Sequence, residues 1–243
     1  MKRAVFILTC ILSAAVAGVC AYLSYIKSSF ENAYLSFAVY LPLFAVSIPL
    51  ASVLHEIGHF FFGAAVRVMA IPKFRLFAPS SCKIVPTKDK GLKGRIIFTA
   101  CGGLAVNFLC IILGVLSLTV RAIPTEISAI LPYSLYLFLI NAFPLWYGSG
   151  KTDGLVISEL IKNEDTAKVM LAVLSVQAQT LQGKKISEID ETMLFSLPQI
   201  REDDENFIAL TYLRYLYFEE KGDTVNAEKY RSRFESLKND YMN

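Results

Sequence analysis

Long apolar runs alternate with short polar stretches over the first 150 residues. Four runs contain no charged residue, at 4–26, 33–54, 96–120 and 127–150. A membrane-crossing helix needs about 20 apolar residues, each adding about 1.5 Å of rise, so every run is long enough to cross a bilayer. The pattern therefore predicts four transmembrane helices. The second run stays apolar, apart from one short polar motif, as far as Val66.

The first run could also be read as a signal peptide, because Lys2 and Arg3 precede it. It is long for the apolar part of a signal sequence, and no clear small-residue cleavage motif ends it. A retained membrane helix is therefore the favoured interpretation.

The segment between the second and third runs shows a different pattern. Residues 73–77 and 83–86 alternate between polar and apolar side chains, and residues 78–82 have the composition of a turn. Alternation of this kind on both sides of a turn is typical of a β-hairpin. We therefore expect a short hairpin at the membrane face.

The end of the chain has helical periodicity without long apolar runs. Apolar positions predict one helix over 206–220 and a second over 224–237, with Gly222 between them. The pair resembles a single tetratricopeptide-like hairpin, although one copy is weak support for a repeat. A small helical cap and a docking module for a substrate or regulator both remain open.

Charge divides the chain near residue 154. Residues 1–154 hold 13 Lys/Arg against 5 Asp/Glu, a net charge of +8, whereas residues 155–243 hold 11 against 16, a net charge of −5. Hydrophobic residues make up 54% of the chain and charged residues 19%, which is more apolar than a typical soluble domain. We therefore expect a transmembrane domain over 1–154 and a helical domain over 155–243. The basic charges flank apolar runs, so we expect no nucleic-acid partner.

The distribution of basic residues also predicts an orientation. Residues 66–95 hold eight Lys/Arg, whereas the loops expected on the other side hold one each, Lys27 and Arg121. Lys and Arg concentrate in cytoplasmic loops. The chain is therefore expected to be a multi-pass protein of the cell membrane, with both termini and the C-terminal domain in the cytoplasm.

Both histidines of the chain fall in the segment HEIGH at residues 55–59. In a helix, His55 and His59 share one face, so both imidazoles can reach one metal ion. Zinc accepts imidazole nitrogen, and Glu56 can take a proton from a zinc-bound water to make it a nucleophile. HExxH strings also arise by chance, but a carboxylate inside an apolar span is costly unless it has a function. The segment predicts a zinc site with Glu56 as the catalytic base.

Two histidines leave zinc without enough protein ligands. The second and fourth runs cross in the same direction, which brings Asp153, at the end of the fourth, to the membrane side of the histidines. From spacing alone, a zinc ligand and a solvated carboxylate at a helix end remain nearly equal interpretations. In an alternative class, a membrane-anchored zinc protease, a Glu on a soluble helix would be the third ligand, and Glu159 or Glu164 could take that place.

Three segments on three different runs resemble the site-2 protease family of intramembrane zinc metalloproteases. They are HEIGH at 55–59, ACGGLAVN at 100–107, and NAFP at 141–144 followed by Asp153-Gly154. The chain departs from the family pattern in two ways. Asp153 follows Asn141 at a longer spacing than is common, and Gly103 stands where the family often has Pro.

The resemblance implies an all-α membrane protein of four transmembrane helices: a three-helix core around one Zn²⁺ and one N-terminal helix. The hairpin and the C-terminal helical domain complete this expected fold. His55, His59 and Asp153 would be the metal ligands and Glu56 the catalytic base. The expected substrate-binding residues are Asn141, Pro144 and Asn107. Pro144 would interrupt the fourth helix, and the Asn107 amide would need a partner on another helix.

The predicted function is hydrolysis of peptide bonds in membrane-spanning or membrane-associated proteins, with the lipid bilayer as the other partner. The alternative from a different class is a non-catalytic membrane scaffold or receptor that acts through the acidic C-terminal domain. The intact HEIGH segment favours the enzyme.

Overall fold

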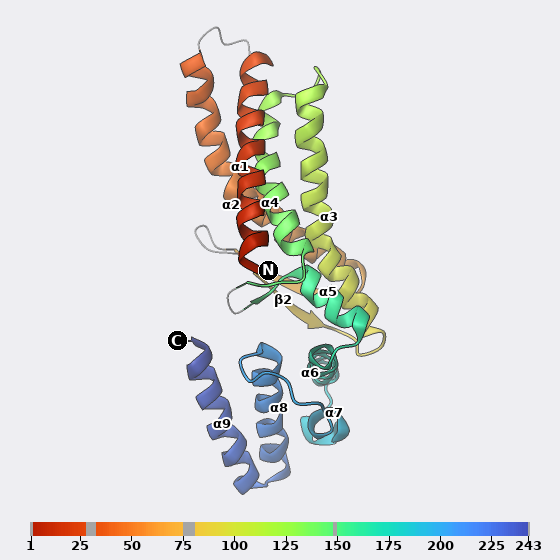
Figure 1. Cartoon of the computed structure of the whole chain (residues 1–243). Coiled ribbons are helices and arrows are strands. Elements are labelled where there is room, and N and C mark those ends of the chain that lie inside the picture. The colour runs from red at the N-terminus through yellow and green to blue at the C-terminus, as the bar shows by residue number, and fades with distance from the viewer. Residues whose placement is uncertain (1, 28–32, 75–80, 148–149, 243) are drawn as a thin grey trace.

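The structure is a computed structural model that describes residues 2–27, 33–74, 81–147 and 150–242. Figure 1 shows an elongated bundle built from the first four α-helices, with the C-terminal helices gathered at one end of it. The elements, with short 3-10 helices labelled η, are α1 (Lys2–Lys27), α2 (Ala33–Ala65), β1 (Val68–Lys73), β2 (Ser81–Pro86), α3 (Leu92–Thr119), η1 (Thr125–Ile130), α4 (Leu131–Ala142), β3 (Trp146–Tyr147), β4 (Gly150–Lys151), α5 (Asp153–Lys162), α6 (Asp165–Leu181), η2 (Ile186–Glu188), α7 (Thr192–Phe195), α8 (Glu205–Lys221) and α9 (Thr224–Met242).

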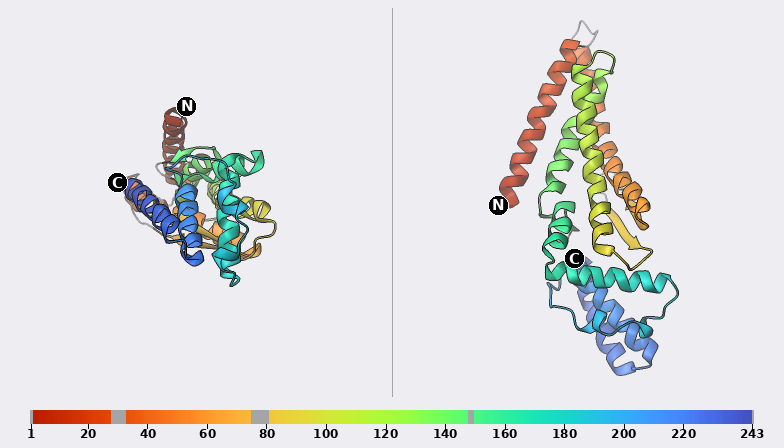
Figure 2. Two further views of the ribbon diagram at one scale, coloured as in Figure 1. Left: turned by 90° about the horizontal axis from the view of Figure 1, so that it is seen from below. Right: turned by 90° about the vertical axis from the view of Figure 1, so that its right-hand side faces the viewer.

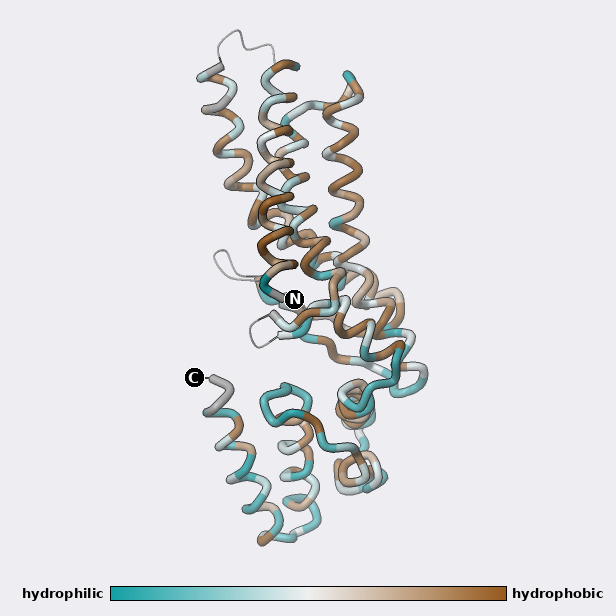
Figure 3. Tube along the Cα trace, in the orientation of Figure 1, coloured by the Kyte–Doolittle hydropathy of each residue, from teal (hydrophilic) through white to brown (hydrophobic). Residues whose placement is uncertain are grey.

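Four helical stretches are long and apolar enough to cross a membrane: Arg3–Lys27, Tyr34–Ala65, Leu92–Thr119 and Thr125–Ala142. Figure 3 shows hydrophobic residues along all four, whereas hydrophilic residues are frequent in the C-terminal helices. Large apolar side chains remain exposed along these stretches, as expected where lipid is the surrounding medium. The predicted helical fold with four membrane-length helices is confirmed.

The fourth helix is shorter than the sequence predicted. The apolar run extends to residue 150, but α4 ends at Ala142 and Phe143 has an extended backbone, with ψ of 140°. Phe143 precedes Pro144, and the proline ring disfavours the helical conformation of the residue before it. Pro144 therefore terminates the helix instead of interrupting it. The following residues pair as the short strands β3 and β4.

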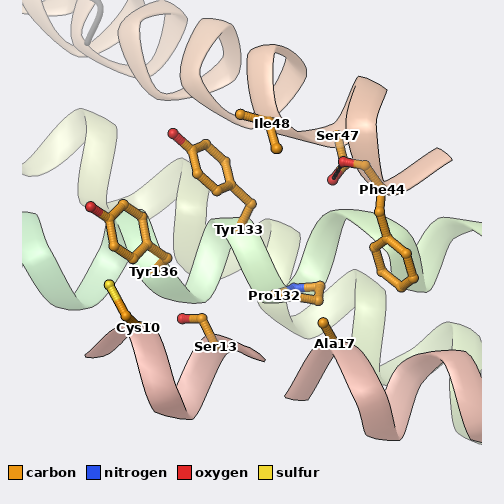
Figure 4. A pocket seen from close by; sticks show the side chains of 9 residues that line it. All are labelled: Cys10, Ser13, Ala17, Phe44, Ser47, Ile48, Pro132, Tyr133 and Tyr136. Atoms are coloured by element: carbon orange, nitrogen blue, oxygen red, sulfur yellow. Dashed lines mark hydrogen bonds between the residues drawn. The ribbon is translucent and has the colours of Figure 1, made fainter. Parts of the chain in front are cut away.

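Helix α1 packs loosely against the other three. Figure 2 shows it diverging from them toward its N-terminal end. An apolar pocket of about 300 Å³ opens between α1, α2 and α4 (Figure 4). By contrast, α3 is the most buried of the four membrane-length stretches and forms the centre of the bundle.

Helices α2 and α3 touch backbone to backbone beside the HEIGH segment. A Cβ atom added to Gly58 would lie 2.4 Å from the carbonyl oxygen of Gly102, and the reverse distance is also 2.4 Å. No side chain fits between the helices at this crossing. Small residues allow such close approach between membrane helices.

The predicted hairpin is present, but its first strand lies earlier than expected. Strand β1 (Val68–Lys73) pairs antiparallel with β2 (Ser81–Pro86), whereas the predicted first strand was 73–77. Val68 and Ala70 are buried alternate positions that place β1 against the bundle. Residues 75–80, with the end of the expected first strand and most of the turn, lie outside the described residues.

A single arginine donates hydrogen bonds to the carbonyl groups that follow the C-terminus of α2. Arg95, near the start of α3, donates from Nε to the carbonyl of Val66 at 2.6 Å and from Nη2 to the carbonyl of Arg67. Its Nη1 donates to the carbonyl of Lys88 at 2.7 Å. Helix C-termini leave carbonyl groups without intrahelical partners, so these bonds fix how the chain leaves α2 and enters β1.

The C-terminal part contains the predicted helix pair. Helix α8 matches its expected range to within one residue at each end, and α9 begins at the expected Thr224 but continues past 237 to Met242. Gly222 between them has φ of 75°. Helix α5 runs across residue 154, the expected domain boundary. Helix α6 joins the two parts of the molecule. Its apolar residues pack into two clusters, one with Val68, Leu92 and Ile96 at the base of the bundle and one with Leu194, Leu210 and Tyr217 of the C-terminal helices.

Candidate metal centre

His55 and His59 lie one turn apart near the C-terminal end of α2, and both are 6% exposed. Their rings meet edge to face, with centroids 4.7 Å apart. The two Nε2 atoms are 3.1 Å apart. The helical spacing therefore presents both nitrogens to one point, as the sequence predicted.

Asp153 lies beside the two histidines. One carboxylate oxygen, Oδ2, is 3.3 Å from His55 Nε2, and the other, Oδ1, is 3.4 Å from His59 Nε2. The three residues form a group that could hold a metal ion. Ligand atoms about 2.0–2.1 Å from a tetrahedral zinc are separated from one another by about 3.3–3.4 Å. The two separations to Asp153, 3.3 and 3.4 Å, agree with that value, and the 3.1 Å between the two Nε2 atoms is slightly shorter.

Local structure explains how Asp153 reaches this position. Thr152 is the N-cap of α5, and its Oγ1 accepts a bond from the Leu155 amide at 3.3 Å. The same oxygen lies 2.7 Å from the carbonyl of Phe143, just beyond α4. A Cβ atom on Gly154 would lie 2.2 Å from the carbonyl oxygen of Ala142. The start of α5 is therefore held directly against the end of α4.

The environment of Asp153 favours its ionised form. Burial by itself raises the pKa of this carboxyl group, but His59 and His55 beside it outweigh burial and lower the pKa to about 2. A carboxylate must be deprotonated to bind a metal ion. Asp153 meets that condition at neutral pH.

The Nδ1 atoms of the histidines show which nitrogens are available to a metal. His59 Nδ1 is 2.9 Å from the carbonyl oxygen of Thr99, and a carbonyl can only accept. Nδ1 of His59 therefore carries a proton, and Nε2 is the nitrogen that faces Asp153 and could bind a metal ion. Metal-binding histidines usually donate their second nitrogen to an oxygen acceptor in this way.

Asn107 has the equivalent place at His55. Its amide group is fully buried, and the Nδ2 atom lies 2.9 Å from His55 Nδ1. Its Oδ1 has no hydrogen-bond partner among the described residues. A half-turn of the amide, whose two ends are assigned from hydrogen bonding, lets Oδ1 accept from Nδ1–H. Both histidines then point their Nε2 atoms toward Asp153.

Glu56 is buried next to the group, with 5% of its surface exposed. It interacts electrostatically with His55, His59 and Asp153. Its Oε2 atom has no hydrogen-bond partner among the residues that the structure describes. A buried carboxylate oxygen without a partner is costly. Glu56 Oε2 is therefore placed to contact a molecule bound at this site.

The residues present fit a metal ion. Two imidazole nitrogens and a carboxylate that face one another within 3.4 Å need positive charge between them, which a bound metal ion would supply in place of protons on the imidazoles. Nitrogen and oxygen donors of this kind suit zinc. Gly103 keeps the space beside them open, because a Cβ atom there would lie 2.6 Å from both Nε2 atoms.

The other expected site residues lie around this group in different ways. Asn141 Nδ2 donates to the carbonyl of Leu137 in its own helix, at 3.0 Å. Pro144 is exposed in the extended segment after α4. Asn107, expected in the substrate groove, has no exposed surface and contacts His55.

The alternative third ligands are engaged elsewhere. Glu159 accepts from Lys151 Nζ at 2.9 Å. Glu164 is on the surface, 3.7 Å from Lys162 Nζ. Within the described ranges, the one group of three candidate metal ligands is His55, His59 and Asp153.

Two contributors were not predicted from the sequence. Thr99 acts through its backbone carbonyl, which no residue pattern reveals. Lys151, two residues before Asp153, has a buried side chain and lies in β4. The available signal was a charged residue between an apolar run and a predicted ligand.

The comparisons with known proteins found no family model, no curated protein and no solved structure that matches this chain. The resemblance to the site-2 protease family therefore depends on the three sequence motifs. The metal-binding geometry stands independently of that resemblance, because it comes from the positions of His55, His59 and Asp153.

Proposed function

We propose that this protein is a zinc-dependent intramembrane metalloprotease. The observation that carries the proposal is the convergence of the His55 and His59 Nε2 atoms on the Asp153 carboxylate. The buried carboxylate of Glu56 lies next to them, and its Oε2 has no hydrogen-bond partner among the described residues. The HEIGH segment and the two further motifs that resemble the site-2 protease family support the same activity.

His55, His59 and Asp153 would hold the zinc ion. When bound, zinc polarises the scissile carbonyl group and lowers the pKa of a water molecule to about 7. Glu56 accepts the proton of the attacking water on its carboxylate. It then returns this proton to the amide nitrogen as the C–N bond breaks, which releases a neutral amine and leaves Glu56 ionised.

The place of the site along the helices supports a membrane substrate. His55 and His59 lie within a membrane-length stretch, and Asp153 follows the end of another one. Water can therefore approach from the side of the hairpin and α5, which the basic residues of 66–95 predict to be cytoplasmic. The peptide must be extended at the scissile bond, since a helix occupies its carbonyl groups in internal hydrogen bonds.

Metal removal tests the proposal. The purified protein in detergent is incubated with a tagged membrane peptide, before and after chelation, and cleavage is followed by electrophoresis. Because the metal has to polarise the carbonyl group, chelation should abolish cleavage, and added Zn²⁺ should restore it while added Mg²⁺ should not. Cleavage by a sample that elemental analysis shows to be free of zinc would overturn the proposal.

Asn107 gives a second prediction. Asn107→Leu removes the acceptor for His55 Nδ1–H, and the loss of such an orienting partner lowers metal affinity about 10- to 100-fold. Asn107→Asp keeps an acceptor at the same place and should bind zinc more tightly than the Leu variant. Zinc affinity is measured by competition with a chromophoric chelator. Equal affinities for the wild type and Asn107→Leu would contradict the orienting role.

A further inference from the structure

Lys151 is a buried lysine that contacts two buried carboxylates. Its Nζ atom is 2.9 Å from Glu159 Oε2 and 2.7 Å from Asp204 Oδ2. The side chains are 5%, 4% and 0% exposed, respectively. These three residues, called the ion cluster below, come from β4, from α5 and from the residue that precedes α8.

The ion cluster holds the chain on both sides of Asp153. Lys151 lies two residues before Asp153, in the strand that pairs with Trp146–Tyr147. Glu159 lies on α5, the helix that Asp153 begins. A displacement of this segment would move the Asp153 carboxylate relative to the histidines on α2.

Asp204 connects the ion cluster to the C-terminal domain. Its Oδ1 atom accepts from the Asn206 amide at 2.9 Å and so caps α8, while its Oδ2 faces Lys151. The start of α8 is thereby attached to the segment that carries Asp153. Helix α8 in turn packs against α9 and α6.

Trp146 provides a second connection between the same two parts. Lys151 Nζ lies 5.1 Å from the centre of its ring, and the Arg201 guanidinium carbon lies 5.2 Å from that centre. Both distances are within the range of cation–π attraction. Arg201 belongs to the segment that leads into α8. The contact between Arg201 and Trp146 therefore joins the β3–β4 segment to the C-terminal domain.

The ion cluster has more negative than positive groups, so Lys151 is its one cation. Two carboxylates face one ammonium group, and Glu205 is a further acid beside them. Burial, together with Asp204, raises the pKa of Glu205, and Lys151 opposes that rise. Removal of the Lys151 charge would leave buried carboxylates without their cation, an arrangement that proteins avoid by moving the groups apart.

We propose that Lys151 is a positioning residue for Asp153, and that the C-terminal domain completes the metal site by supplying Asp204 to the ion cluster. This inference rests on the proposed zinc-binding function. The inference is that the ion cluster and the metal site are energetically coupled, because the contacts that hold Lys151 also hold Asp153 in position. Coupling of this kind is reciprocal, so zinc should also strengthen the attachment of Lys151 to Asp204.

The test compares two cluster variants with two surface controls in the full-length protein. Lys151→Met removes the cation at similar length, and Asp204→Asn removes the charge but keeps a residue that caps helices well. Lys168→Met and Asp165→Asn make the same chemical changes in an exposed ion pair away from the ion cluster. Zinc affinity is measured by chelator competition, helix content by circular dichroism, and the emission of Trp146, the sole tryptophan, during zinc titration.

We expect both cluster variants to bind zinc about tenfold or more weakly than the wild type, in the range found for residues that orient metal ligands. Their helix content should be unchanged, and the controls should bind as the wild type does. Zinc should change the Trp146 emission of the wild type and controls, and the change should be smaller in the cluster variants.

The remaining outcomes decide against the inference. Folded cluster variants with wild-type zinc affinity would overturn it and leave the proposed function standing. Weaker binding that occurs only together with loss of helix content would assign the cluster to folding, not to positioning. A wild-type protein that binds no zinc would overturn the proposed function and the inference together.

Discussion

Glu56→Gln is expected to lower the rate of peptide cleavage by about 10²- to 10⁴-fold, the usual contribution of a general base. The Gln amide has the same shape as the carboxylate but cannot accept the proton of the attacking water. Zinc content should not change, because Glu56 is outside the group formed by His55, His59 and Asp153. The measurement is cleavage of a tagged membrane peptide, with zinc determined in the same sample.

Glu126→Gln is the matched control, because Glu126 is an exposed glutamate of η1. It should cleave at the wild-type rate. Unchanged cleavage in Glu56→Gln would remove the catalytic base from the mechanism. An unchanged cellular phenotype in that variant would favour the scaffold or receptor function instead.

The second large effect is expected from the third ligand. Asp153→Ala should weaken zinc binding by at least about 100-fold, more than the loss of an orienting partner does, because it removes a charged ligand itself. Cleavage should be lost in parallel. Zinc affinity is measured by chelator competition in detergent, and circular dichroism confirms that the variant keeps its helices.

Glu164→Ala is the comparison for this variant, since Glu164 is the one of the two glutamates considered as third ligands that is not part of the ion cluster. It is exposed beside Lys162 and should bind zinc as the wild type does. The opposite result, with zinc retained in Asp153→Ala and lost in Glu164→Ala, would exchange the two assignments.

The membrane-length helices were predictable from the sequence. Each apolar run is long enough to cross a bilayer as a helix, and few other structures can accommodate so long an apolar segment. The proximity of the two imidazoles was predictable because helical spacing alone places His55 and His59 on one face. The direction of the spans placed Asp153 on the same membrane side as the histidines, but the spacing alone left its role as a ligand open. The end of α4 was misplaced, since the apolar run continues past Pro144 while the backbone cannot remain helical before it.

The contacts that position His55, His59 and Asp153 could not be predicted from the sequence. The contact between Asn107 and His55 depends on how α2 and α3 are rotated against each other, and no residue pattern specifies that rotation. The Thr99 contact uses a backbone carbonyl, which every residue has. Lys151 and Asp204 meet only after the C-terminal helices fold back beneath the bundle. Long-range pairing of this kind is decided by packing, not by local preference.

The contact between Gly58 and Gly102 means that main-chain atoms, not side chains, set the width of the space in front of the histidines. A distance set by side chains can be changed by substituting one residue for a smaller or larger one. A distance set by main-chain atoms changes only when a whole helix shifts. The space between the histidines and α3 should therefore be hard to change by point substitution at this crossing, and easier to change through residues that tilt the whole of α3.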